Sequence, residues 1–321
     1  DKNGKVELHS QKEVEELVNK LKNEKFEVLS VKNGERRKKP PLPFTTSTLQ
    51  QEASKRLNMS TQKTMRLAQE LYEGVNLKGK GSIGLITYLR TDSTRISEEA
   101  DASCREYIAQ QYGEQFVGDK TAVKSSKTGK IQDAHEAIRP TDSSLSPAML
   151  KEQLPRDLFR LYQLIWTRFL ASRMAEAVYE TTSVKIGAGD YRFNVAASKV
   201  KFDGFMTVYS YDSEKSTMNA AMKKITKDTE ITLSGLDPQQ HFTQPPAHFT
   251  EASLVKTLEE LGIGRPSTYA PTITTLLARR YIVKESKNLY ITELGEAVND
   301  MMEDGFPTIV DVNFTANMES L

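Results

Sequence analysis

Residues 81–97, GSIGLITYLRTDSTRIS, place a tyrosine at the end of an apolar run and follow it with polar side chains. Arg90 stands two residues after Tyr88, and the tetrapeptide Thr-Asp-Ser-Thr fills residues 91–94. One interpretation is a buried tyrosine at a strand end, hydrogen-bonded through its hydroxyl, before a polar helix entry. The other is a reactive phenol beside a fixed positive charge. The stretch alone favours the first interpretation.

The second interpretation corresponds to phosphoryl transfer. A phenol is mostly protonated at neutral pH, so it attacks poorly unless a cation stabilises the phenolate. Arg90 is always charged and can bind two phosphate oxygens at once. A phosphotyrosyl bond would keep the energy of the broken phosphodiester, so resealing would need no ATP. The stretch GVNLKGKGS does not supply an ATP site, because Gly81 stands where a P-loop needs Ser or Thr.

Two later stretches could also contact phosphate. DAHEAIRPTD offers His135 as a donor to a phosphate and Arg139 as structural or electrostatic support. EELGIGRPSTYAPTITTLLARR places Pro266 in the first turn of an expected helix, with Arg265 and Ser267 at its positive end. Each stretch, taken by itself, fits an ordinary capped turn at least as well.

Composition narrows the class of protein. The 321 residues carry 44 basic and 43 acidic side chains, so any affinity for nucleic acid must come from local patches. No apolar run approaches the roughly 20 residues that cross a bilayer. The single cysteine, Cys104, excludes disulfides and cysteine-based zinc sites, and the histidines are scattered. We expect a soluble protein of a reducing cytosol. The sequence begins with a polar segment and ends without a terminating turn, so we also expect it to be a fragment of a longer protein.

The order of patterns indicates a multidomain α+β fold. A strand-like FEVLSV is followed by the boundary NGERRKKPPLPF, and helical patterns then run to about residue 176. From Val178 the sequence is rich in residues that favour β-strands. Another strand-like stretch, TEITLSG, covers residues 229–235. Residues 250–304 read as helix, turn, helix, β-hairpin and helix, which is the outline of a winged helix.

Taken together, the three stretches resemble the signature blocks of bacterial DNA topoisomerase I, of the type IA class. The resemblance is carried by ITYLRTDSTRIS, AHEAIRPT and EASLVKTLEELGIGRPSTYAPTI, and it covers nearly the whole chain. It implies that Tyr88 is the nucleophile, left with a 5′-phosphotyrosyl bond, and that Arg90 holds the scissile phosphate. The residues that it implies for DNA binding are His135, Arg139, Arg265, Ser267, Tyr269 and, on weaker grounds, Arg279.

The resemblance also implies an architecture, in which a helical domain carrying the tyrosine hangs from a β-rich arch and the parts form a ring. We expect residues 1–45 and 177–246 to form the arch, residues 46–176 the helical domain, and residues 247–321 an incomplete winged-helix-like base. The implied function is ATP-independent relaxation of negatively supercoiled DNA through cleavage and religation of one strand. The implied partners are that DNA and single-stranded DNA, with no membrane, for a full-length enzyme that is a monomer in the bacterial cytoplasm, at the nucleoid.

The chain departs from the family pattern in one large respect. The family's catalytic centre also uses an acidic, Mg²⁺-binding (Toprim) domain with a DxDxE cluster, and this chain has no DxDxE. No zinc-ribbon cysteines follow either. We therefore expect Mg²⁺ to be bound by a domain of the full-length enzyme outside this chain, no metal site within it, and little or no activity of the chain alone.

Other interpretations remain open. The topoisomerase half of a reverse gyrase has similar motifs, although no helicase half is present. Topoisomerase III is less favoured, because its tyrosine block usually has a proline where Leu89 stands. A non-catalytic single-strand binding module would use ERRKKP and KGKGS to track phosphates and Tyr88 to stack on a base. The last possibility is a purely structural scaffold.

Overall fold

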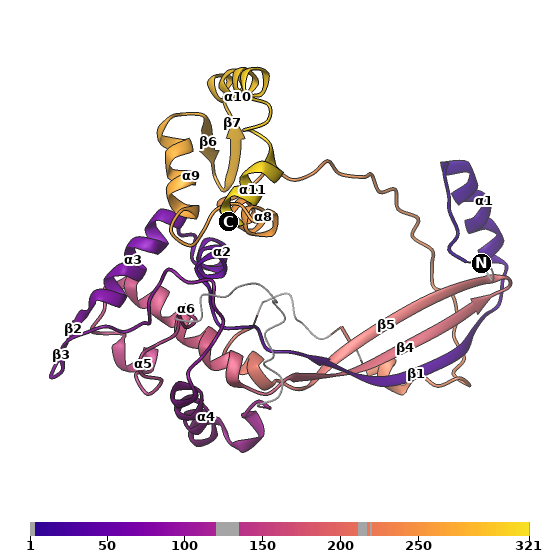
Figure 1. Ribbon diagram of the computed structural model, residues 1–321. Coiled ribbons are helices and arrows are strands. Elements are labelled where there is room, and N and C mark those ends of the chain that lie inside the picture. The colour runs from indigo at the N-terminus through magenta and orange to yellow at the C-terminus, as the bar shows by residue number, and fades with distance from the viewer. Residues whose placement is uncertain (1–3, 120–134, 211–216, 219, 321) are drawn as a thin grey trace. The chain divides into compact units, whose positions relative to one another are not determined.

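The computed structural model describes residues 4–119, 135–210, 217–218 and 220–320. The chain divides into two compact units (Figure 1). Unit 1 comprises residues 1–39 and 176–245, and unit 2 comprises residues 40–175 and 246–321. Unit 2 is therefore made of two stretches that are far apart in the sequence, and each unit is described by itself.

Unit 1 is built around an antiparallel sheet whose strands follow the order β1-β4-β5. Figure 1 shows these strands side by side as a long, twisted ribbon. The β-rich texture predicted from Val178 onward is confirmed, because β4 and β5 form a hairpin around Gly189, which has a φ of 55°. The elements of the unit are α1 (Gln11–Lys22), β1 (Phe26–Lys38), β4 (Ala177–Ala188), β5 (Tyr191–Phe202), η3 (Gly204–Thr207) and α7 (Ala220–Lys224).

Two sequence expectations fail in unit 1. β1 runs straight through the Asn33-Gly34 turn signal, because β4 offers a pairing partner along its whole length and the Thr182 hydroxyl donates to Asn33 Oδ1 at 2.9 Å. The strand stops just before Pro40, which has no N–H to donate. The strand expected over residues 229–235 is not formed, since only Glu230 meets a strand there, as a single bridge to Glu27.

The first stretch of unit 2 is helical, and its helices begin at the residues that the sequence suggests. Thr45 caps α2 in a capping box, Ser60 caps α3, and Ser97 caps α4. Gly74 ends α3, and glycine is the residue typical of this position. The elements are α2 (Thr46–Leu57), α3 (Thr61–Glu73), the hairpin β2 (Val75–Leu77) and β3 (Gly81–Ile83), α4 (Glu98–Tyr112), η1 (Glu114–Phe116), α5 (Pro147–Leu150) and α6 (Arg156–Arg173).

Helix α6 supplies much of the core of this stretch. Leu161, Tyr162, Ile165 and Phe169 are each at most 1% exposed, which is the periodicity of one helix face. The two large polar aromatics are both satisfied: the Tyr162 hydroxyl donates to Leu145 O, and Trp166 Nε1 donates to Ser143 O. Burial raises the pKa of the Tyr162 phenol. The side chain is therefore structural and neutral at any physiological pH.

The second stretch of unit 2 has the predicted helix, turn, helix and hairpin. Val255, Tyr269 and Ile273 form its small core. The second helix begins at Tyr269, later than Pro266, because the N–H groups of Thr268 and Tyr269 both donate to Arg265 O and form a separate turn. The elements are α8 (Glu251–Leu261), α9 (Tyr269–Ala278), β6 (Ile282–Glu285), β7 (Asn288–Ile291), α10 (Glu293–Gly305) and α11 (Val312–Ser320).

A buried carboxylate joins the two stretches of unit 2. Glu251, at the start of α8, accepts hydrogen bonds from Thr61 N at 2.7 Å and Thr61 Oγ1 at 3.0 Å, at the start of α3. Its other oxygen accepts from Lys284 Nζ of β6 at 2.8 Å. Burial tends to raise the pKa of Glu251, but hydrogen bonds from Lys284 and Thr61 outweigh it, so the net shift is downward. The carboxylate is therefore charged at neutral pH.

Candidate active site

The segment from Gly84 to Arg95 carries the candidate nucleophile and is held in place by its neighbours. Its first residues are paired on two sides. Leu85 N donates to Leu71 O of α3 at 2.8 Å, and Thr141 N donates back to Leu85 O at 3.0 Å. Leu85, Ile86 and Leu89 are each at most 1% exposed, so the apolar run is anchored in the core of unit 2.

The second sequence block pairs directly with the first. Thr87 N donates to Arg139 O at 2.9 Å, and Thr87 Oγ1 donates to Ala137 O at 2.7 Å. Arg139 N in turn donates to Thr87 Oγ1 at 3.0 Å. These bonds flank Tyr88 on its N-terminal side and place His135 beside it.

The start of α2 holds the chain on the other side of Tyr88. The Thr46 hydroxyl, fully buried, donates to Leu89 O at 2.7 Å and accepts from Thr91 N at 2.9 Å. Thr46 N donates to Thr91 O at 2.9 Å. One threonine thus fixes the backbone on both sides of Arg90.

The candidate catalytic side chains project from this fixed backbone. Tyr88 is 37% exposed, and Arg90 is also exposed. The ring centroid of His135 lies 5.3 Å from that of Tyr88, and the ring of Tyr72 meets Tyr88 edge-on at 5.6 Å and 67°. The structure therefore places Tyr88 beside His135 and Tyr72 at a surface, and Arg90 is exposed two residues farther along the chain.

The hydroxyls that follow Arg90 are not all available for chemistry. Thr91 and Ser93 are 2% and 3% exposed, and their side chains accept from Ser93 N and Arg95 N, respectively. They form successive side-chain turns that shape the chain. Asp92 is exposed. Thr91 and Ser93 therefore support the backbone of this segment.

Arg139 is engaged within the protein. Its Nη2 lies 2.6 Å from Glu136 Oε2, its Nε lies 3.1 Å from the same oxygen, and its side chain is only 13% exposed. Glu136 also accepts from Ser97 N, at the start of α4. Burial tends to raise the pKa of Glu136, but the bonds from Arg139 and Ser97 lower it overall. This ion pair supports the second block from behind.

The third block contributes residues in different settings. Arg265 pairs with Glu319 at 3.1 Å, and Ser267 and Arg279 are exposed. Tyr269 is only 6% exposed, and burial, together with the charge of Glu259, raises its pKa to about 12. The charge of Asp92 acts in the same direction, so the third block lies near the segment that carries Tyr88.

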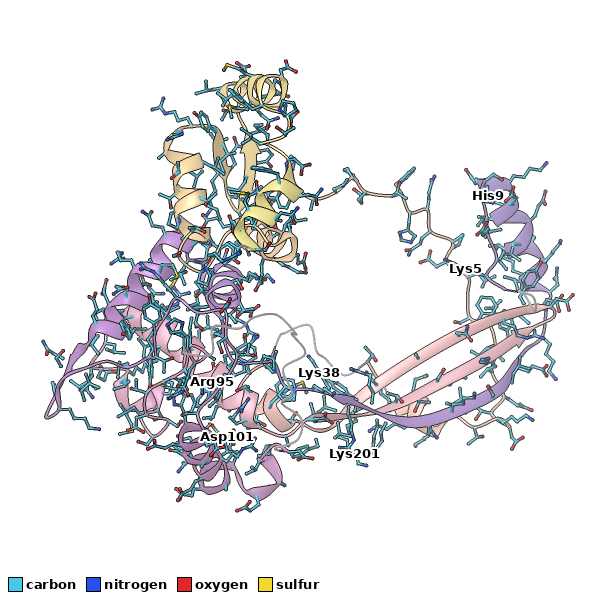
Figure 2. The ribbon with its side chains drawn as sticks, in the orientation of Figure 1. Lys5, His9, Lys38, Arg95, Asp101 and Lys201 are labelled. Atoms are coloured by element: carbon cyan, nitrogen blue, oxygen red, sulfur yellow. The ribbon has the colours of Figure 1, made fainter. Side chains whose placement is uncertain are left out.

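Neither a metal centre nor a membrane helix is found in the part of the chain that the structure describes. Within residues 4–119, 135–210, 217–218 and 220–320, no three His, Cys, Asp or Glu side chains are grouped so that they could hold a metal ion. The described residues therefore do not fit Mg²⁺. Asp101, which Figure 2 labels on α4, forms ion pairs with Arg105 and Arg173. Over the same residues, no helix is long and apolar enough to cross a membrane.

Two residues of the site are not indicated by the sequence patterns. Thr46 reads as one of several hydroxyls before a helix, and its bonds to Leu89 and Thr91 span more than forty positions. Tyr72 reads as a surface residue near the end of α3. No local signal could have found either residue, since each acquires its role from a segment distant in the sequence.

The sequence and the fold match those of a known class of DNA enzymes. A family model for DNA topoisomerase matches residues 1–321, and the chain belongs to this family as a type IA topoisomerase domain. Full-length topoisomerase I from Thermotoga maritima has a similar structure, with a TM-score of 0.79 and 37% sequence identity. The match covers 98% of this chain and 50% of that one, so the chain spans half the length of this relative.

Proposed function

We propose that this chain is the domain of a bacterial DNA topoisomerase I that cuts and reseals one DNA strand through Tyr88. The Tyr88 oxygen attacks the backbone phosphorus, the bond to the 3′ oxygen breaks, and the phenol proton is released while the 3′ oxygen gains one. The product is a 5′-phosphotyrosyl bond, itself a phosphodiester. Attack by the 3′-hydroxyl reverses the step, so resealing needs no ATP.

Arg90 and His135 are the residues proposed to handle the phosphate. Arg90 is exposed and its backbone is fixed on both sides by Thr46, which suits a side chain that must meet an anion repeatedly in one place. His135 lies beside the Tyr88 ring and can donate to a phosphate oxygen. In phosphoryl transfer, such positioning and charge neutralisation make up most of the protein's contribution.

The observation that carries this proposal is the setting of Tyr88. A tyrosine that served only to fill the core would be buried, as Tyr162 is, whereas Tyr88 is 37% exposed on a backbone that is hydrogen-bonded on both sides. An exposed side chain on an immobilised backbone is the arrangement that a nucleophile needs, because attack requires a near-linear approach at about 3 Å.

The remaining roles form part of the same proposal. Arg265, Ser267, Tyr269 and Arg279 would border a path for single-stranded DNA, with Tyr269 acting through its helix rather than its buried ring. Arg139 would act through Glu136 and the backbone of the second block. We propose the arch, helical and base domains as delimited from the sequence, negatively supercoiled DNA as the substrate of a monomeric full-length enzyme, and the bacterial cytoplasm as its location.

Bacterial topoisomerase I is proposed over reverse gyrase because the similar Thermotoga structure bears that name and is 37% identical over 98% of this chain. The Mg²⁺ that the resemblance implies would be held by the acidic domain, so no step is assigned to it here. We expect the chain alone to form no covalent adduct.

A covalent-trapping experiment tests the proposal. The full chain is mixed with the family's acidic domain, Mg²⁺ and an end-labelled single-stranded oligonucleotide, and then denatured. We expect a labelled protein–DNA adduct whose nucleotide-bearing peptide contains residue 88, and we expect Tyr88→Phe to abolish it. Arg90→Ala should reduce the adduct without abolishing DNA retention.

Two outcomes would contradict the proposal. An adduct mapped to another residue would reassign the nucleophile. Retention of the oligonucleotide without any adduct, unaffected by Tyr88→Phe and falling steeply with salt, would identify a non-catalytic binding module instead.

A further inference from the structure

Among the described residues, Tyr72 is an aromatic neighbour of the candidate nucleophile to which the proposed function gives no part. It lies in the last turn of α3 and is 40% exposed. Its ring meets the Tyr88 ring edge-on, with centroids 5.6 Å apart and planes at 67°. The His135 ring is tilted by 36° relative to the Tyr88 ring, with centroids 5.3 Å apart. In the part of the chain that the structure describes, Tyr88 therefore has ring neighbours from two different segments.

The position of Tyr72 is set by an unusually close backbone approach. A Cβ on Gly84 would lie 2.7 Å from Tyr72 O, so only glycine lets the segment before Tyr88 run this close to the end of α3. The adjacent bond from Leu85 N to Leu71 O locks the approach. The register between α3 and the Tyr88 segment thus fixes where the Tyr72 ring stands.

A side chain as exposed as Tyr88 would otherwise sample several rotamers. Tyrosine turns about two side-chain torsions, and only a small part of that range carries its oxygen to one point in space. Edge-to-face arrangements are among the preferred geometries of aromatic pairs, so this contact favours one orientation of the Tyr88 ring. Reaction rates are sensitive to such restriction, because a misplaced nucleophile loses the advantage of orientation.

We propose that Tyr72 is a positioning residue for the nucleophile: its ring and that of His135 hold the Tyr88 phenol in the orientation from which it attacks the phosphate. This inference rests on the proposed function of Tyr88. The ring, and not the hydroxyl, of Tyr72 is the acting part, since the contact is made by ring atoms and the structure gives the hydroxyl no partner among the described residues.

Matched variants separate positioning from stability and from DNA binding. Tyr72→Phe keeps the ring and Tyr72→Leu removes it. Tyr107→Leu is the control, because Tyr107 makes a comparable edge-on contact, 5.8 Å at 87°, with Trp166 rather than with Tyr88. Each variant is mixed with the family's acidic domain and Mg²⁺, and the rate constant of adduct formation is measured in a single turnover at saturating oligonucleotide. Affinity for the oligonucleotide is measured separately, with each change placed in a Tyr88→Phe background.

We expect removal of the Tyr72 ring to lower the rate of the chemical step and to leave DNA binding unchanged. Tyr72→Leu should slow adduct formation about threefold to tenfold, with unchanged oligonucleotide affinity, whereas Tyr72→Phe should react within about twofold of the unaltered chain. Tyr107→Leu should lower the melting temperature and leave the rate constant unchanged.

Other results would overturn the inference. An unchanged rate in Tyr72→Leu would remove the positioning role, and an equal loss in Tyr72→Phe would transfer the role to the hydroxyl. Weaker binding of the oligonucleotide at an unchanged rate would make Tyr72 a base-stacking contact. If the unaltered chain, mixed with the acidic domain and Mg²⁺, gives no adduct at residue 88, the proposed function fails, and that failure is distinguishable because it precedes every comparison among variants.

Discussion

Replacing Glu251 with glutamine tests what holds the two stretches of unit 2 together. The carboxylate is 3% exposed and accepts from Thr61 N, Thr61 Oγ1 and Lys284 Nζ. Thr61 N and Glu251 itself both belong to the first turns of helices, where a negative charge is favoured. Glutamine has nearly the same shape but no charge, and one of its two terminal atoms is a donor. That atom must face either Thr61 or Lys284, which are donors themselves.

The magnitude follows from these contacts. A hydrogen bond to a charged group contributes about 1.5–3 kcal/mol, and removing one partner of a buried pair costs about 3–5 kcal/mol. Lys284 is 34% exposed and can turn toward water, which reduces the cost. We therefore expect Glu251→Gln to lower the free energy of unfolding by about 2–3 kcal/mol. For a unit of this size the melting temperature should fall by about 5–10 °C.

The dependence on pH follows from the direction of the pKa shift. The pKa of Glu251 is lower in the folded protein than in the unfolded chain, where a glutamate titrates near 4.3. Its stabilising contribution is therefore complete above that value and is lost as the pH falls through the folded pKa. Glu251→Gln lacks this contribution at every pH, so the difference between the two proteins should shrink below about pH 4.

Urea denaturation measures both effects. Trp166, the only tryptophan, reports on the first stretch of unit 2, and far-UV circular dichroism reports on all helices. Glu260→Gln is the control, because its pair with Lys256 is exposed and contributes little. A loss at neutral pH no larger than that of the control would refute this reasoning, and so would a difference that persists unchanged at pH 3.

Three further predictions address the surroundings of the site. Thr46→Val should reduce adduct formation at saturating oligonucleotide far more than Thr46→Ser, which keeps the hydroxyl that fixes the backbone around Arg90; equal losses would show that the hydroxyl is dispensable. Gly84→Ala should slow the same reaction and lower the melting temperature, because its Cβ would meet Tyr72 O at 2.7 Å; a crystal structure of this variant with an unmoved Tyr72 would contradict that account. Asp101→Asn should destabilise the fold by about 3 kcal/mol in urea titrations, since it leaves Arg105 and Arg173 largely buried without a counter-charge, whereas a neutral outcome would mean that water replaces the carboxylate.

Much of the local structure could be predicted from the sequence, because it depends on neighbours. Ser60 and Gly74 bound α3 through capping geometry that is readable in a few residues. The alternation after Val178 indicates strands for the same reason. β1 shows the limit of this approach: Asn33-Gly34 is a strong turn signal, and a partner strand more than a hundred positions away overrides it.

The same distinction applies to the candidate site: features set by the local sequence could be predicted, and features set by packing against other segments could not. Tyr88, Arg90 and His135 could be proposed because their residue types and spacing indicate phosphate chemistry, and the resemblance added their roles. The inward turn of Thr91 and Ser93 could not be predicted, because a hydroxyl in a polar run suits solvent and backbone equally well. The roles of Thr46 and Tyr72 could not be predicted either, because their partners are brought to them only by the packing of α2 and α3.

The pairing of β1 with β4 has a consequence for how the chain is made. A ribosome releases β1 long before β4, with the whole of residues 40–175 between them, so β1 must wait with both edges unpaired. Residues 40–175 are inserted between β1 and β4. The chain leaves the sheet after Lys38 and returns to it at Ala177, and these two residues are paired with each other. Once the insertion has folded, it holds the end of β1 close to the start of β4. Little entropic cost of closing this long loop then remains, and β1 can pair with β4. Synthesis of the nascent chain should therefore complete the helical stretch first and the sheet second.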